Sequence, residues 1–236
     1  MGCRQSTATS SITPSGSENE FARSHHSKKE EVSYGLTLPC KFLELYEIVL
    51  NDKKEPLILG LGSFSKVFKV VHTTSKEQFA LKYVDMKHIA NRGKAAVDRT
   101  QGEVRRGVSV LQNLHHPSII NLIDYFESPN TMCVVLELAG VELYDHVVEK
   151  GKLTEMETAE ILRSISEGVH FMHEKNLVHR DLKPENVVLS FSSGDKWKII
   201  DFGFSRMIET KMTRMKSFVG TMNYVAPGEL CLFRYI

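Results

Sequence analysis

The chain has 236 residues, of which 42% are hydrophobic, and this is enough to bury the core of one large domain or two small ones. The 30 basic and 29 acidic residues give a net charge of +1, which argues against a nucleic-acid partner. We find no run of about 18 to 20 apolar residues and no signal-peptide core, so we expect neither a membrane-spanning nor a secreted protein.

The first 33 residues are rich in Ser, Thr, Glu and Lys and hold few apolar residues, so a disordered tail is predicted over 1–33. Its start, Met1-Gly-Cys-Arg-Gln-Ser6, fits the signal for N-myristoylation of Gly2, with Cys3 beside it available for palmitate. One myristoyl chain gives only marginal membrane binding, so the cysteine would decide stable attachment. Short motifs of this kind also arise by chance, and an unmodified tail is the competing interpretation.

Apolar residues become frequent along a lead-in segment at 34–55. Two apolar stretches, 56–61 and 67–71, flank a Gly/Ser turn, and a third follows at 78–84. This is the pattern of an antiparallel sheet. A further strand is predicted at 131–138.

Two helices are predicted from apolar residues at helical spacing. The first covers 98–114 and ends before His-His-Pro117, because proline disfavours a helical conformation in the residue before it. The second runs over 154–175 and starts with a capping box of Thr154 and Glu157. Strands therefore precede helices, which is the order of an α+β fold.

The turn between the first two strands carries glycines, which let backbone amides approach phosphate oxygens without a Cβ in the way. It reads Leu59-Gly-Leu-Gly-Ser-Phe-Ser-Lys-Val67. Lys82, at the end of the third strand, is placed to reach phosphates as a point charge. Taken singly, a glycine hairpin and a solvated edge lysine explain these two features equally well.

The most specific segment is His179-Arg-Asp-Leu-Lys-Pro-Glu-Asn186, followed by Asp201-Phe-Gly at the end of a predicted strand over 196–200. Phosphoryl transfer needs an acceptor for the proton of the attacking hydroxyl and hard oxygen ligands for magnesium. Carboxylates and an amide at this spacing supply both. With these landmarks in the same order, the chain resembles the protein kinase superfamily from about Glu55 to Glu229.

The resemblance implies an α+β, protein kinase-like fold of two lobes. A strand-rich N-lobe would cover 56–138, and a C-lobe with the catalytic loop and activation segment would cover 139–236. The C-lobe is expected to be incomplete, because few residues follow the activation segment. Lys-Pro-Glu in the loop and Gly220-Thr221 after it point to serine/threonine acceptors, and the chain looks most like the calcium/calmodulin-dependent group.

The same resemblance implies roles for single residues. Asp181 would be the catalytic base and Lys183 would contact the γ-phosphate, while Leu136 would close the back of the adenine slot. Asn186 and Asp201 would hold Mg²⁺. The ATP-binding residues would be Leu59, Gly60, Gly62, Ser65, Val67, Ala80, Lys82, Glu137, Ala139, Glu142 and Val188.

The sequence departs from the family pattern on the first helix. The family has a glutamate there that pairs with the strand lysine, and counting back from Pro117 this position holds Gly107. Glu103 lies one turn earlier, about 5.4 Å along the axis. We therefore expect Asp201 to be the carboxylate nearest Lys82. The alternative is a shifted helix in which Glu103 forms the pair.

These features predict a protein serine/threonine kinase that uses ATP and Mg²⁺, with Glu142 and Glu185 selecting a basic residue upstream of the acceptor. Gly107 and Gly228, which replace family glutamates, leave open a catalytically impaired, pseudokinase-like nucleotide-binding protein. A membrane-tethered interaction protein is a further alternative. The four scattered cysteines fit reduced thiols, so we expect a cytoplasmic protein, held at the cytoplasmic face of a membrane if its tail is acylated.

Overall fold

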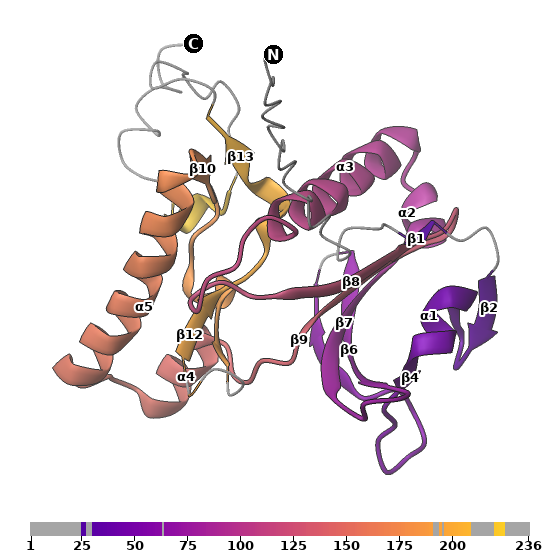
Figure 1. Cartoon of the computed structure of the whole chain (residues 1–236), viewed down its shortest axis with the longest axis horizontal. Helices are drawn as coiled ribbons and strands as arrows, with labels where there is room; N and C mark the ends of the chain where they lie inside the picture. The colour runs from indigo at the N-terminus through magenta and orange to yellow at the C-terminus, as the bar shows by residue number, and fades with distance from the viewer. Residues whose placement is uncertain are drawn as a thin grey trace, which may run out of the picture.

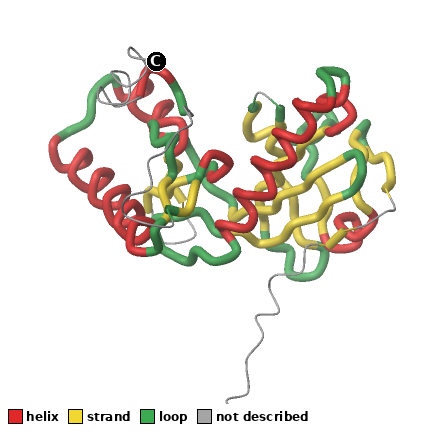
Figure 2. Tube along the Cα trace, turned by 90° about the horizontal axis from the view of Figure 1, so that it is seen from above, coloured by secondary structure: helices red, strands yellow, loops and turns green. Residues whose placement is uncertain are grey.

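The computed structural model describes residues 25–26, 30–62, 64–190, 194, 196–208 and 220–224. Gly2, Cys3 and Gly228, which the sequence analysis singled out, lie outside these residues. Figure 1 shows a sheet with short and long helices around it, followed by a part dominated by the helix α5 (Glu155–Glu174). Figure 2, turned by 90°, places the sheet at one end of the molecule and α5 at the other.

The predicted antiparallel pairing is confirmed, within a sheet that also holds one parallel pair of strands. Its strands are β1 (His25–His26), β4 (Tyr46–Ile48), β5 (Ile58–Leu61), β6 (Ser65–His72), β7 (Gln78–Asp85), β8 (Leu122–Glu127) and β9 (Thr131–Glu137). They follow the order β1-β8-β9-β7-β6-β4, and β5 also pairs with β6. Because side chains alternate along a strand, β7 sends Leu81 into the core on one face and Lys82 into a cavity on the other.

An N-terminal hairpin and helix cover the first of these faces. They are β2 (Glu30–Ser33), β3 (Leu36–Pro39) and α1 (Cys40–Leu45). Leu38, Phe42 and Tyr46 are buried there in one apolar cluster with Leu81. The expected boundary at residue 33 therefore falls inside a hairpin, and the expected disorder does not extend to β1 and β2. The polar composition of β2 gave no sign of a strand. Backbone hydrogen bonds to β3 hold this strand, and any sequence can make such bonds.

Helices α2 (Met86–Ala90) and α3 (Lys94–Leu111) cover the opposite face (Figure 1). Met86, Ile89 and Val108 are buried there against Val134 of the sheet. The structure confirms the predicted first helix, although α3 starts and ends earlier than the range 98–114. It forms the wall between the sheet and the segment that follows β12 (Lys196–Ile199).

The second part of the chain holds short strands beside two helices. These elements are α4 (Leu143–Lys150), β10 (Leu177–Val178), β11 (Val187–Ser190), β13 (Arg206–Met207) and the 3₁₀ turns η1 (Pro184–Asn186), η2 (Phe202–Phe204) and η3 (Met222–Tyr224). The capping box of Thr154 and Glu157 opens α5 as predicted. A Cβ on the buried Gly168 of α5 would lie 3.0 Å from Ile199, so this glycine lets α5 pack closely on β12. Among the described residues, none of the helices combines the length and apolarity needed to cross a membrane.

Candidate active site

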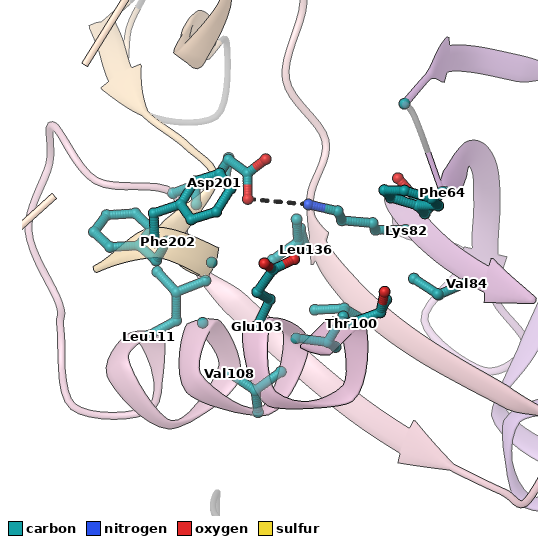
Figure 3. Close-up of a pocket in the computed structure, with 18 residues that line it drawn as sticks. Phe64, Lys82, Val84, Thr100, Glu103, Val108, Leu111, Leu136, Asp201 and Phe202 are labelled. Carbon is teal, nitrogen blue, oxygen red and sulfur yellow. Dashed lines mark hydrogen bonds and ion pairs between the residues drawn. The ribbon is translucent and has the colours of Figure 1, made fainter. Parts of the chain in front are cut away.

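A cavity of about 260 Å³ lies between α3, the glycine turn and η2 (Figure 3). Four residues predicted to bind ATP or metal line it, namely Gly62, Ser65, Lys82 and Asp201. Its other walls are mainly apolar side chains of the sheet and α3, including Phe64, Val84, Val104, Val108, Leu111, Val134 and Leu136. The cavity thus joins the turn expected to hold phosphates with the residue expected to hold metal.

Lys82 and Asp201 meet inside this cavity. The Lys82 ammonium lies 3.2 Å from Asp201 Oδ1, as Figure 3 shows. The positive charge of Lys82 holds the pKa of Asp201 below its usual value, so this carboxylate is ionised near neutral pH. The sequence analysis expected Asp201 to be the carboxylate nearest Lys82, and the ion pair agrees with this expectation.

The alternative pairing of Lys82 with Glu103 is not found. Glu103 lines the same cavity, but among the described ion pairs Lys82 has Asp201 as its partner. Burial raises the pKa of Glu103. A Cβ on Gly107 would lie 3.5 Å from the backbone nitrogen of Gly203, so this position faces the segment that follows Asp201.

The side chain of Asp181 is held by three neighbours. Asn186 Nδ2 donates to Asp181 Oδ2 at 3.0 Å, and the Lys183 ammonium lies 3.1 Å from the same oxygen. Thr221 donates its hydroxyl to Asp181 Oδ1 at 2.7 Å, and it accepts a hydrogen bond from Lys183 at 2.8 Å. Asp181, Lys183 and Asn186 therefore lie together, as predicted from the loop sequence. Thr221 was not predicted as a site residue, although the Gly-Thr pair in the activation segment was a signal for it.

The backbone of this loop is fixed by the residues beside Asp181. His179 is buried, bonds through Nε2 to the Ile200 carbonyl at 2.9 Å and accepts the Asp181 N–H at Nδ1. Burial lowers the pKa of His179, which favours the neutral ring that this pair of contacts requires. Arg180 adopts a positive φ of 70° and donates to the Phe204 carbonyl at 2.6 Å. The loop is therefore tied to both sides of Asp201.

Gly220 brings the activation segment onto the catalytic loop. Its φ of +118° is a conformation that L side chains rarely adopt, and a Cβ there would lie 2.7 Å from the Arg180 carbonyl oxygen. A glycine at this position is needed for the neighbouring Thr221 to reach Asp181.

Leu136, predicted to close the back of the adenine slot, lines the cavity, whereas the other residues predicted to hold adenine, from β5, β6, β7, β9 and β11, lie beside it. Ala80 is paired with Leu136 across β7 and β9, and Glu142 forms a bridge with Val188. Leu59 is exposed on β5. The remaining predicted residues also lie on these elements or next to them, namely Gly60, Val67, Glu137 and Ala139. Val188 is buried in an apolar cluster against which Leu136 and Ala139 pack.

Asn186 and Asp201 provide the hard oxygen ligands that Mg²⁺ prefers. Both amide hydrogens of Asn186 point to Asp181, to its backbone oxygen at 2.7 Å and to its carboxylate, which leaves Oδ1 for a cation. Within the described ranges no three His, Cys, Asp or Glu side chains gather as a complete metal site. Mg²⁺ usually takes one or two protein ligands together with substrate phosphates, and Asn186 and Asp201 would be the protein ligands here.

An anchored carboxylate base, a lysine-aspartate pair and a glycine turn together define a site for phosphoryl transfer from a nucleotide. The comparison with known families agrees, since residues 54–232 match the family model described as the protein kinase domain. The chain belongs to the protein kinase family. The predicted two-lobe, α+β fold class is thereby confirmed.

Known relatives include serine/threonine kinases. The chain is 38% identical over 169 residues to the carbon catabolite-derepressing protein kinase of Saccharomyces cerevisiae, covering 72% of this chain and 25% of that protein. It is 34% identical over 196 residues to calcium-dependent protein kinase 4 of Plasmodium falciparum, covering 81% and 36%. For the probable serine/threonine-protein kinase fhkD of Dictyostelium discoideum, the values are 37% over 174 residues, with 72% and 22% covered. The chain thus spans about a quarter to a third of these relatives.

Proposed function

We propose that this chain transfers the γ-phosphoryl group of ATP to serine or threonine hydroxyls of proteins, in the presence of Mg²⁺. The observation that carries the proposal is the environment of Asp181, whose two carboxylate oxygens are each oriented by a neighbour. A base held in this way can accept the proton of a hydroxyl as the oxygen attacks the phosphorus. Family membership and the named relatives support the same reaction.

Charged side chains divide the remaining tasks. Lys183 lies against Asp181 and would neutralise charge on the transferred phosphoryl group. Lys82 would hold the other phosphates from β7. Bound Mg²⁺ would neutralise phosphate charge, with Asn186 and Asp201 as its protein ligands.

The acceptor and its flanking residues are a finer part of the proposal. Burial is the main cause that raises the pKa of Glu142, and the nearby negative charges of Asp145 and Glu185 raise it further. These three side chains form an acidic cluster. This acidic cluster favours a substrate with a basic residue upstream of the acceptor. Such a preference would also fit the proposed place of the chain near the calcium/calmodulin-dependent group.

The test is an assay with γ-labelled ATP, the purified chain and a serine-containing peptide with upstream arginine. We expect label on serine or threonine after acid hydrolysis, and its loss when EDTA removes Mg²⁺. A peptide with upstream glutamate is the control for the acidic cluster. Stabilisation by Mg·ATP without transfer to any peptide would contradict the proposal and indicate a nucleotide-binding protein instead.

We also propose that the tail attaches the protein to the cytoplasmic face of a membrane through acylated Gly2 and Cys3. Alkyne-tagged myristate should then label the wild-type chain in cells, and Gly2→Ala should abolish the label. Cys3→Ser should keep the myristate but move most of the protein to the soluble fraction, because one acyl chain binds only marginally. Membrane association that persists in the double variant would contradict acyl attachment.

A further inference from the structure

Helix α3 carries two adjacent arginines that reach different parts of the molecule. Arg105 forms a two-pronged contact with Glu127 at the end of β8, with Nε at 3.2 Å from both carboxylate oxygens and Nη2 at 2.5 Å from one of them. Tyr125 donates its hydroxyl to the same carboxylate at 2.6 Å. Glu127 is buried, so this contact fixes α3 to the sheet.

Arg106 points to the other side, toward the segment that carries Asp201. Its Nη1 donates to the backbone carbonyl of Gly203 at 2.9 Å. The next residue, Gly107, packs against the backbone of the same segment without a side chain. Phe202, between the two ends of this segment, is buried in the apolar cluster beneath α3. The 3₁₀ turn η2 is therefore held by two contacts, namely the burial of its own Phe202 side chain and the hydrogen bond from Arg106 of α3.

The family's usual link between this helix and the cleft is a glutamate-lysine pair, and this chain lacks it. Lys82 pairs with Asp201, and Glu103 forms no described ion pair with Lys82. Among the described contacts, no side chain of α3 therefore forms an ion pair with Lys82. The arginine-carbonyl bond is the polar contact by which α3 reaches the metal-binding segment.

We propose that Arg106 is a positioning residue that holds the Asp201-Phe-Gly203 segment for metal binding, in place of the missing glutamate-lysine pair. This deepens the proposed function and rests on it. A guanidinium stays charged at all physiological pH values, and its bond to a neutral carbonyl restrains the backbone two residues after Asp201. Loss of this restraint should let the Asp201 carboxylate sample orientations that do not bind Mg²⁺.

The first measurement is hydrogen exchange on the apo chain, which needs no catalytic activity. In Arg106→Ala, amides between residues 199 and 208 should exchange about fivefold to tenfold faster, the change expected for losing one solvent-exposed hydrogen bond of ordinary strength. Arg163→Ala, at another exposed helix arginine in α5, is the matched control and should leave this segment unchanged. Unchanged exchange in Arg106→Ala would overturn the proposal, whether or not the wild-type chain transfers phosphate.

The second measurement is the Mg²⁺ concentration at half-maximal transfer. Arg106→Ala should raise it about fivefold, with little change in the KM for the peptide, whereas Arg106→Lys should lie between wild type and alanine because it keeps the charge but reaches less far. If the substitution only lowered the thermal stability of the chain, the Mg²⁺ requirement would not rise while the KM for the peptide stayed the same. No phosphoryl transfer by wild type would count against the proposed function, while the exchange result would still decide the role of Arg106.

The third measurement is a rescue. Gly107→Glu places a carboxylate where the family has one, and there is ordinary van der Waals space for its Cβ. In the Arg106→Ala background, this change should restore the wild-type Mg²⁺ requirement, and Glu103→Ala should not affect it. A folded double variant that keeps the raised requirement would overturn the idea that Arg106 stands in for the ion pair.

Discussion

Replacing Asp181 with asparagine is expected to slow phosphoryl transfer by at least about 10³-fold, within the range that a positioned general base supplies. Asparagine keeps the shape of the side chain and can still accept from Thr221. It cannot take up the substrate proton, and it loses the charge that attracts Lys183 at 3.1 Å. The chemical step should therefore fail while the nucleotide site remains.

The measurement is single-turnover transfer from labelled ATP, together with nucleotide affinity from a thermal shift. Affinity for Mg·ATP should stay within about threefold of wild type, because Asp181 is assigned to the acceptor and not to the nucleotide. Asp52→Asn, at an exposed loop position, is the control for the same chemical change. An Asp181→Asn variant that keeps more than a tenth of the rate would assign the base to another residue.

The catalytic loop could be predicted from sequence because its chemistry lies in consecutive residues. His179 to Asn186 contains the base, a lysine and a metal ligand, and each fits a role that phosphoryl transfer demands. The sheet and the helix α5 were predictable for a similar local reason, since apolar stretches around a Gly/Ser turn and the capping box are local sequence patterns. The expectation that Asp201 lies nearest Lys82 came from the resemblance, because Gly107 stands where the family has the pairing glutamate.

Contacts between distant segments were not predictable in this way. Thr221 reaches Asp181 only because Gly220 lets the activation segment approach the loop backbone. Arg106 had the pattern of any helix-surface arginine, and only the packing of α3 on η2 shows its carbonyl partner. Glu137 was assigned to the ATP site by the resemblance, and the sequence did not indicate which residue its side chain would contact. Its partner lies on β12, far along the sequence.

Glu137 forms a buried ion pair with Lys198 of β12. Among the charged contacts of the core, we expect the loss of this pair to destabilise the fold most. Lys198 is fully buried on β12, and its ammonium lies 2.5 Å from Glu137 Oε1 at the end of β9. The other oxygen of Glu137 accepts from Asn121 at 2.6 Å. Within the described residues neither Lys198 Nζ nor Glu137 Oε1 makes an aligned hydrogen bond, so each charge depends on the other.

Lys198→Ala is therefore expected to destabilise the chain by about 3 to 5 kcal/mol, the usual cost of leaving one buried charge without its partner. Removal of the lysine also opens a cavity beside β12, which adds to the loss. Urea unfolding followed by circular dichroism measures this change. Lys196→Ala, two residues earlier on the same strand but exposed, should stay within about 0.5 kcal/mol of wild type.

A double-mutant cycle separates the ion pair from the lost volume. Lys198→Met keeps most of the volume and still strands the Glu137 carboxylate, so it should cost nearly as much as alanine. Adding Glu137→Gln removes the stranded charge while keeping an acceptor for Asn121, and should recover at least about 2 kcal/mol of that loss. Because Glu137 begins the segment expected to contact adenine, Lys198→Met should also raise the KM for ATP more than the KM for the peptide. Additive effects of the two substitutions would mean that the two charges do not stabilise each other in the folded chain.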